Sequence, residues 1–161
     1  MRETEKYYFF WKHQFGQWTL RDIIDEGGIN YNCCEQYMMT HKALLFDDLD
    51  SAKKILCEKD PREQQRLGRI ISDFNQEIWD ANKEEIVYRG NKLKFYQHFD
   101  LQKRLIETFP KIFVEASPYD RVWGVGLSAN DDLILDEKNW KGENLLGKVL
   151  TRVRNDFVEG V

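Results

Sequence analysis

The sequence predicts an α+β fold, formed by a helix-rich chain with a small antiparallel sheet. Apolar residues recur at helical spacing through most of the 161 residues, whereas alternating strand patterns are short and few. Hydrophobic residues make up 42% and aromatic residues 14% of the chain, which allows a packed core and excludes a disordered protein. Helices and strands do not alternate regularly, so a doubly wound parallel sheet is not expected. No repeat or linker interrupts the chain, and we expect a single domain over residues 1–161.

The first expected elements are strands. Residues 7–11 are aromatic and predict a short strand, and residues 20–31 predict a hairpin around the glycine turn at 25–28. At Cys33 the apolar period becomes helical, and it continues through about Phe46.

Polar residues indicate where the next helices begin. Asp48 is a good N-cap for a second helix. The Asp-Pro pair at 60–61 begins a third helix, which runs to Gly68. Asp73 is expected to cap a long helix that ends at Gly90, since glycine commonly follows the last helical turn.

The rest of the chain predicts shorter elements and a terminal helix. In order, these are helical pieces at 93–99 and 101–109, strands at 112–114 and 123–127, and a polar loop at 130–139. Pro110 ends the second helical piece, because proline cannot continue a helix. The acidic part of the loop is expected to be a solvated turn, and Asn144 begins the terminal helix.

Charge and cysteine content narrow the class of protein. The net charge of -4 argues against a sequence-independent nucleic-acid binder, which is normally basic. Cys33, Cys34 and Cys57 have no metal-ligand spacing, and we expect buried thiols in a reducing compartment. No apolar stretch approaches membrane-spanning length, and the N-terminus has no signal core. A cytoplasmic protein with no membrane partner is therefore expected.

Glu35 and Lys42 are the first candidates for chemistry. They are seven residues apart in a predicted helix, so their side chains leave it in nearly the same direction. Alone, such a pair is an ordinary solvated surface contact. The alternative is a carboxylate and an amine that face one substrate, and the motifs further along the chain favour this alternative.

Those motifs follow in a fixed order. They are Gly68-Arg69, Trp79, Lys94-Phe95, the segment from Glu115 to Gly126 with Asp120 and Trp123, and the segment from Trp140 to Gly147 with Asn144. Together with residues 31–42, the series closely resembles the NADAR family, also called YbiA-like proteins. The resemblance runs from about residue 15 to about residue 157. No single motif is specific, whereas the ordered set is.

The resemblance implies an α+β, YbiA-like fold and an N-glycosidase, which cleaves the bond between a ribose and a nitrogen atom. Members of the family act on phosphorylated ribosylamino-pyrimidine intermediates of riboflavin synthesis, or remove ADP-ribose attached to guanine in nucleic acid. The expected partner is thus a small phosphorylated ribosyl substrate or ADP-ribosylated nucleic acid. The net acidity slightly favours the small molecule, because nucleic acid would be repelled. A non-catalytic module that binds ADP-ribose or a related nucleotide is the alternative.

Carboxylates suit this chemistry, because positive charge develops at the ribose carbon as the bond breaks. Matched to the family's motifs, Glu35 is the expected general base or acid, and Asp120 orients the ribose or stabilises the cation. Lys42 either attacks the sugar as a neutral amine and forms an imine, or holds a phosphate as a point charge. The structural alternatives are a first-turn helix acid for Glu35, and a turn cap or a partner of Arg121 for Asp120.

Four residues are expected to bind the substrate. Trp79 and Trp123 match the family's tryptophan positions and would stack on the flat base, with core packing as the alternative. Glycines beside Trp123 favour a pocket there, because they let the backbone approach a ligand. Arg69 is a candidate phosphate clamp or an ordinary helix-terminus arginine. Asn144 lies where a helix N-terminus binds an anion, or where it only caps the helix.

No metal or cofactor is implied, since the histidines show no metal-ligand pattern and no carboxylate cluster replaces it. Two positions depart from the family pattern. Many relatives carry Phe-Ser-Asn-Phe where this chain has Phe15-Gly-Gln-Trp18, which predicts a different substrate choice if that segment contacts ligand. Gln36 stands where many relatives place histidine, so no catalytic histidine is assigned beside Glu35.

Overall fold

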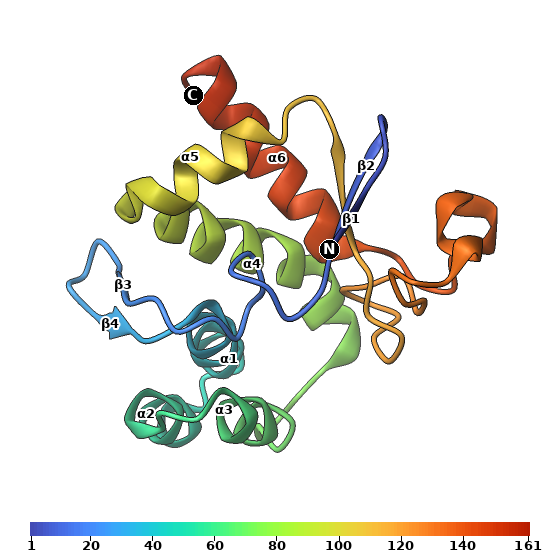
Figure 1. Cartoon of the computed structure of the whole chain (residues 1–161). Coiled ribbons are helices and arrows are strands. Elements are labelled where there is room, and N and C mark those ends of the chain that lie inside the picture. Colours follow the sequence, from blue (N-terminus) through green and yellow to red (C-terminus); the bar gives the residue numbers. More distant parts are fainter. The chain divides into compact units, whose positions relative to one another are not determined.

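The computed structural model describes residues 1–161 and confirms the α+β class, with six α-helices and short strands (Figure 1). The chain forms two compact units. Residues 17–97 make the first, called here the helical unit, and residues 1–16 with 98–161 make the second, the sheet unit. The expected single domain over the whole chain stays a prediction. None of the helices combines the length and the apolar character needed to cross a bilayer.

The helical unit begins with the predicted hairpin. Its strands are β3 (Ile23–Ile24) and β4 (Asn30–Tyr31), which pair antiparallel. Gly28 adopts φ 80° in the turn between them, a conformation that glycine tolerates without a steric penalty. The chain then enters α1 (Cys34–Leu45), as the change of period predicts.

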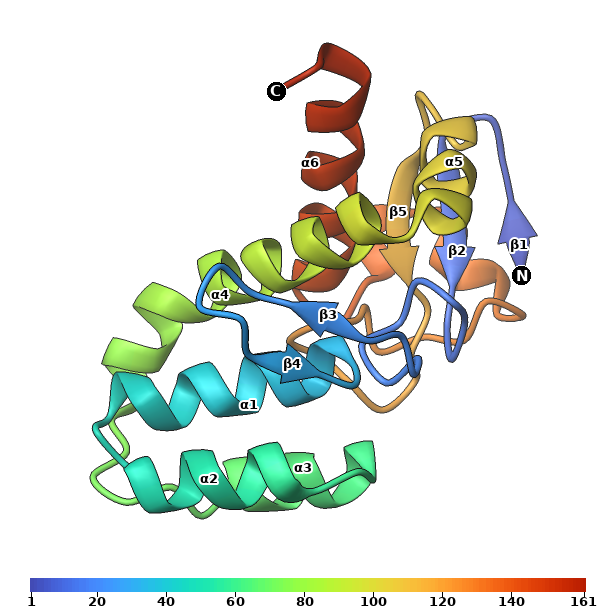
Figure 2. The ribbon, with the colours of Figure 1, turned by 90° about the vertical axis from the view of Figure 1, so that its left-hand side faces the viewer.

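Helix α1 is the centre of this unit and packs against its three other helices. These are α2 (Leu49–Cys57), α3 (Pro61–Gly68) and α4 (Gln76–Gln97). Figure 2 shows α2 and α3 side by side along one side of α1, with α4 on the other. Both predicted helix starts are confirmed: Asp48 accepts a hydrogen bond from the Ser51 N–H at 3.0 Å, and Asp60 accepts one from the Arg62 N–H at 2.9 Å.

Helix α4 differs from the prediction at both ends. Asp73 has φ 55° and precedes the helix, whereas Asn75 accepts the N–H of Ile78 at 3.0 Å and is the cap. The helix passes through Gly90 and includes most of the predicted piece at 93–99. Gly90 is needed for contact with α1, because a Cβ there would lie 2.6 Å from Cδ1 of Tyr37.

The sheet unit has three strands in the order β1 (Arg2–Glu3), β2 (Tyr7–Phe10) and β5 (Ile112–Glu115). β1 and β2 are antiparallel, whereas β2 and β5 are parallel, which differs from the expected antiparallel sheet. A parallel pair requires a long crossover connection, and the whole helical unit lies between these two strands in the chain. Local sequence patterns carry no signal for such a pairing.

Two helices complete the sheet unit, α5 (Phe99–Glu107) and α6 (Leu145–Glu159), and α6 packs on β5 and on α5. The predicted strand at 123–127 is wrong. Val125 makes two isolated backbone bonds, donating to Glu115 O at 3.0 Å and accepting from Lys141 N at 2.8 Å, and this segment stays irregular. Its apolar residues are explained by burial, since Val125 and Leu127 belong to the core of this unit.

The loop at 130–139 is less simple than predicted. It contains two 3₁₀ turns, Asp132–Leu135 and Glu137–Asn139, and Ile134 is fully buried between the exposed Leu133 and Leu135. Asp131 caps the first turn and Asp132 pairs with Arg2 at 2.8 Å. The acidic residues therefore have structural partners.

Candidate active site

Glu35 and Lys42 lie on a buried face of α1. Only 2% of Glu35 and 9% of Lys42 is exposed, because α1 is covered by the other helices of its unit. The Glu35 N–H donates to Gln17 O at 3.0 Å, which ties the first turn of α1 to the segment before the hairpin. A solvated surface contact is thus not the explanation of this pair.

The Lys42 ammonium has a defined set of neighbours. Nζ donates to Gly68 O at 2.8 Å and lies 4.7 Å from the ring centroid of Phe74 and 5.2 Å from that of Trp79. Burial lowers the pKa of Lys42, the charge of Arg69 lowers it further, and Glu35 opposes both effects. The neutral amine is therefore more accessible than in an exposed lysine.

The α1–α3 contact makes this arrangement possible. Gly68 ends α3 directly against Met39, and a Cβ on Gly68 would overlap with the Met39 side chain. Because α3 approaches α1 so closely, the last carbonyl of the helix reaches the Lys42 ammonium.

Arg69 follows as the C-cap of α3, with an exposed side chain that has no partner within the chain. Its charge is close enough to act on the pKa of Lys42. An unpaired guanidinium beside a buried amine is consistent with the predicted phosphate clamp, which stays a prediction.

Trp79 and Phe74 cover Lys42 from the same unit. Trp79 is only 7% exposed, so its ring packs in the interior, whereas 41% of Phe74 is exposed. Phe74 lies in the loop between α3 and α4, and its ring meets that of Phe46 at a centroid distance of 5.3 Å. Sequence reasoning missed Phe74, because a lone aromatic residue in a loop carries no periodic signal.

Asp120, Trp123 and Asn144 belong to the sheet unit. Oδ1 of Asp120 accepts the N–H groups of Val122 at 2.9 Å and Trp123 at 2.8 Å, so this carboxylate does cap the turn that carries Trp123. Its second oxygen makes no hydrogen bond within the chain, which leaves one acceptor for a ligand.

The glycines beside Trp123 serve contacts within the chain. A Cβ on Gly124 would lie 3.0 Å from the carbonyl oxygens of Glu115 and Asp120, and one on Gly142 would overlap with Gly124 O. The chain itself occupies the space that these glycines leave. Their presence therefore does not indicate a ligand at Trp123.

Both polar atoms of the Asn144 side chain form hydrogen bonds within the chain. Oδ1 accepts the Glu115 N–H and Nδ2 donates to Phe113 O, both at 2.9 Å, which fastens α6 to β5. The next two N–H groups of α6 donate to the carbonyls of Val122 and Trp123, each at 3.1 Å. The N–H groups of Leu145 and Leu146 are thus engaged within the chain, the Asn144 side chain does not form the helix cap, and the anion site expected there stays a prediction.

Gln36 has a structural role. Its Nε2 donates to the carbonyls of Ile55 at 3.0 Å, Leu56 at 3.3 Å and Glu58 at 2.9 Å, at the C-terminal end of α2. The residue that departs from the family's histidine thus fastens α2 to α1.

The cysteines follow the prediction in two of three cases. Cys33 and Cys34 are buried, whereas Cys57 is exposed at the end of α2. Burial raises the pKa of Cys34 to about 11 and that of Cys33 to about 12, so both stay protonated thiols.

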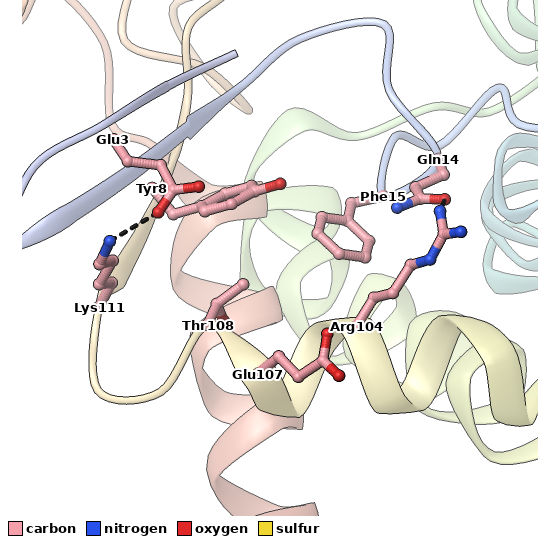
Figure 3. A pocket seen from close by; sticks show the side chains of 8 residues that line it. All are labelled: Glu3, Tyr8, Gln14, Phe15, Arg104, Glu107, Thr108 and Lys111. Carbon is pink, nitrogen blue, oxygen red and sulfur yellow. Dashed lines mark hydrogen bonds and ion pairs between the residues drawn. The ribbon is translucent and has the colours of Figure 1, made fainter.

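The sheet unit also has a surface pocket of about 230 Å³ (Figure 3). It contains none of the predicted site residues. Three of its charged side chains have partners: Lys111 pairs with Glu3 and Arg104 donates to Gln14, each at 2.6 Å. This pocket is not a part of the candidate site.

Comparison with known proteins identifies similar sequences along the whole chain. The NADAR domain model matches residues 1–158. An N-glycosidase of Acanthamoeba polyphaga mimivirus is 46% identical over an alignment of 167 positions, which covers 96% of this chain and 98% of the relative. The riboflavin biosynthesis protein PYRR of Zea mays is 29% identical over 143 residues, which are 83% of this chain but 21% of that protein.

The chain is also similar to a protein of known structure. The NMR structure of the E. coli protein YbiA matches 99% of this chain and 89% of its own, with a TM-score of 0.79 and 24% sequence identity. This likeness confirms the YbiA-like fold expected from the sequence.

Proposed function

Because the chain belongs to the NADAR domain family, we propose that it is an N-glycosidase, a hydrolase that cleaves the bond between a ribose and a nitrogen atom. The mimivirus relative, which matches over almost its full length, carries that name. The observation that supports the proposal most is the buried pair of Glu35 and Lys42. An acid and an amine with a lowered pKa, both withdrawn from water, are typical of catalytic groups.

Lys42 acts as the nucleophile in this proposal. Glu35 takes a proton from the Lys42 ammonium, and the neutral amine forms a bond to the ribose carbon C1′. The bond from C1′ to the base nitrogen breaks, and Glu35 gives its proton to that nitrogen. Opening of the sugar ring leaves an imine between Lys42 and C1′. Water then adds to the imine and releases the sugar as its aldehyde, which restores the amine.

The lowered pKa of Lys42 favours this role over a simple contact with phosphate. A residue that holds a phosphate works best as a fully charged and exposed ammonium. Lys42 is instead buried against Phe74 and Trp79 and already donates to Gly68 O. Arg69, exposed and unpaired beside it, is the better candidate for phosphate. Asp120 and Trp123 remain candidates in the sheet unit.

The substrate in this proposal combines a flat base, a ribose and at least one phosphate. The maize relative's name supports a phosphorylated ribosylamino-pyrimidine of riboflavin synthesis. ADP-ribose attached to guanine in nucleic acid is the second substrate, and the net charge of -4 makes it the less favoured one. We also propose a cytoplasmic location.

An assay with both substrates tests the proposal. Wild type, Glu35→Gln and Lys42→Arg are each offered the pyrimidine ribotide and an oligonucleotide with guanine-linked ADP-ribose, and the release of base or sugar is measured by mass spectrometry. We expect wild type to cleave one of them and both variants to lose at least about 100-fold in rate. The control is Lys83→Arg, since Lys83 is equally buried but pairs with Asp80 at 2.7 Å.

The alternative, a non-catalytic binding module, predicts a different result. Wild type would leave both substrates intact and still bind ADP-ribose, and Glu35→Gln would bind it with unchanged affinity. That result would reject the glycosidase.

A further inference from the structure

The loop between α3 and α4 presents an aromatic ring next to the Lys42 amine. Phe74 is 41% exposed, and its ring centroid lies 4.7 Å from Lys42 Nζ. Two aliphatic residues near it in the chain, Ile70 in the same loop and Ile78 in α4, are exposed by 63% and 45%. One exposed apolar side chain is common on protein surfaces, so the position alone decides nothing.

The loop is held in place at several points. The Ser72 N–H donates to Asp48 Oδ2 at 2.9 Å, which fastens the loop to the start of α2. Asp73 has φ 55°, a conformation that is costly for a residue other than glycine. Phe46, at the C-terminal end of α1, supports the Phe74 ring by an edge contact with an interplanar angle of 62°. An exposed ring with this much support is positioned rather than free.

A base can stack only on a ring with an accessible face. Trp79, which the sequence predicts for this role, is 7% exposed and packs against the Lys42 ammonium. Phe74 contacts the same ammonium, and the residue is 41% exposed. Of the two aromatic residues beside Lys42, Phe74 is the more exposed, and this favours it as the one that meets a partner.

We propose that Phe74 is the platform on which the flat base of the substrate stacks. This inference rests on the proposed function and adds to it the residue that recognises the base. Stacking tolerates any base with a π-face, so Phe74 selects for a nucleobase but does not distinguish one base from another. Trp79 and Gly68 then only set the environment of Lys42.

The competing explanation is that Phe74 merely shields Lys42 from water. Phe74→Leu separates the two, because leucine still covers the amine but offers no π-face. Phe74→Tyr keeps the face and serves as the conservative variant. Phe99→Leu is the matched control, since Phe99 is also exposed, at 76%, and belongs to the sheet unit.

The test is calorimetric binding of guanosine 5′-monophosphate and of ribose 5-phosphate, which lacks the base. We expect Phe74→Leu to bind the nucleotide about tenfold more weakly, within the range for loss of one base–aromatic stack. Its affinity for ribose 5-phosphate should not change, and Phe74→Tyr and Phe99→Leu should match wild type with both ligands.

Equal nucleotide affinity of wild type and Phe74→Leu would overturn the inference, and so would a wild-type protein that does not bind the nucleotide. Failure of the proposed function is distinguishable from this. In that case wild type cleaves neither substrate, while its nucleotide affinity still depends on Phe74.

Discussion

Replacing Gly90 by alanine is expected to destabilise the crossing of α1 and α4. The new Cβ would lie 2.6 Å from Cδ1, 3.1 Å from Cγ and 3.2 Å from Cε1 of the Tyr37 ring. That ring has little freedom to move, because it packs on His41 at 4.1 Å and on Tyr31 at 5.0 Å between centroids. The backbone of α4 would have to shift away from the helix that carries Glu35.

Two opposing effects determine the magnitude. Alanine favours a helix interior over glycine by about 1 kcal/mol. Overpacking a tight core costs about 1–3 kcal/mol, and a ring that already packs against two other rings indicates the upper end of that range. The net loss is then about 2 kcal/mol. For a chain of this length, the melting temperature should fall by about 4–8 °C.

Urea denaturation followed by circular dichroism measures this loss. The control is Glu84→Ala, which replaces an exposed residue of α4 and should change stability by less than about 0.5 kcal/mol. Adding Tyr37→Leu to Gly90→Ala removes the ring, and most of the loss assigned to the alanine should disappear in this double-mutant cycle. A Gly90→Ala protein as stable as wild type would refute the reasoning.

Three further predictions concern the same unit. Gln36→Ala removes the donor shared by three carbonyls at the C-terminal end of α2. It should lower the free energy of unfolding, measured in urea, by about 1–3 kcal/mol. An unchanged free energy of unfolding would contradict the role of Gln36. Burial lowers the pKa of Lys42 below its usual 10.5, so the unfolded chain binds the proton more tightly than the folded one. Wild type should therefore gain stability relative to Lys42→Met as the pH rises toward 10.5, measured by urea denaturation, and a stability difference that does not change with pH would refute this. Hydrogen bonds from Ser51 and from the Ser72 N–H hold the pKa of the Asp48 carboxyl far below its usual 3.8. The stability advantage of wild type over Asp48→Ala should therefore be present at neutral pH and disappear as the pH falls through and below 3.8. Thermal unfolding measures this advantage, and an advantage that persists in acid would contradict it.

The parts of the fold that the sequence predicts correctly depend on neighbouring residues. Asp48 and the Asp-Pro pair at 60–61 start helices because their side chains bond to N–H groups two or three residues later. The hairpin at 20–31 follows from a glycine that can adopt a positive φ.

The parts that could not be predicted depend on residues far away in the chain. Gly90 has the signature of a helix end, and only the Tyr37 ring from α1 explains its place inside α4. The apolar residues at 123–127 have the composition of a strand, but they are buried in irregular structure. The parallel pairing of β2 with β5 depends on how the intervening residues fold, and neither strand's own sequence indicates it.

The candidate site also has a part that the sequence predicts and a part that only the packing of the helices explains. Helical spacing places Glu35 and Lys42 on one face of α1, and this much the sequence predicts. Their burial, and the carbonyl of Gly68 on the ammonium, arise from the packing of α3. Phe74 has no partner at regular spacing, and only the folded loop brings it to Lys42.

The central claim is that Lys42 forms a covalent bond to the sugar, and reductive trapping tests it most directly. Borohydride is added to the wild-type protein during reaction with the pyrimidine ribotide and, separately, with the ADP-ribosylated oligonucleotide, and the peptides are then analysed by mass spectrometry. We expect a stable sugar adduct on the peptide that contains Lys42, and none with Lys42→Arg. Cleavage of a substrate by wild type with no trapped species, or with an adduct on another residue, would contradict the account.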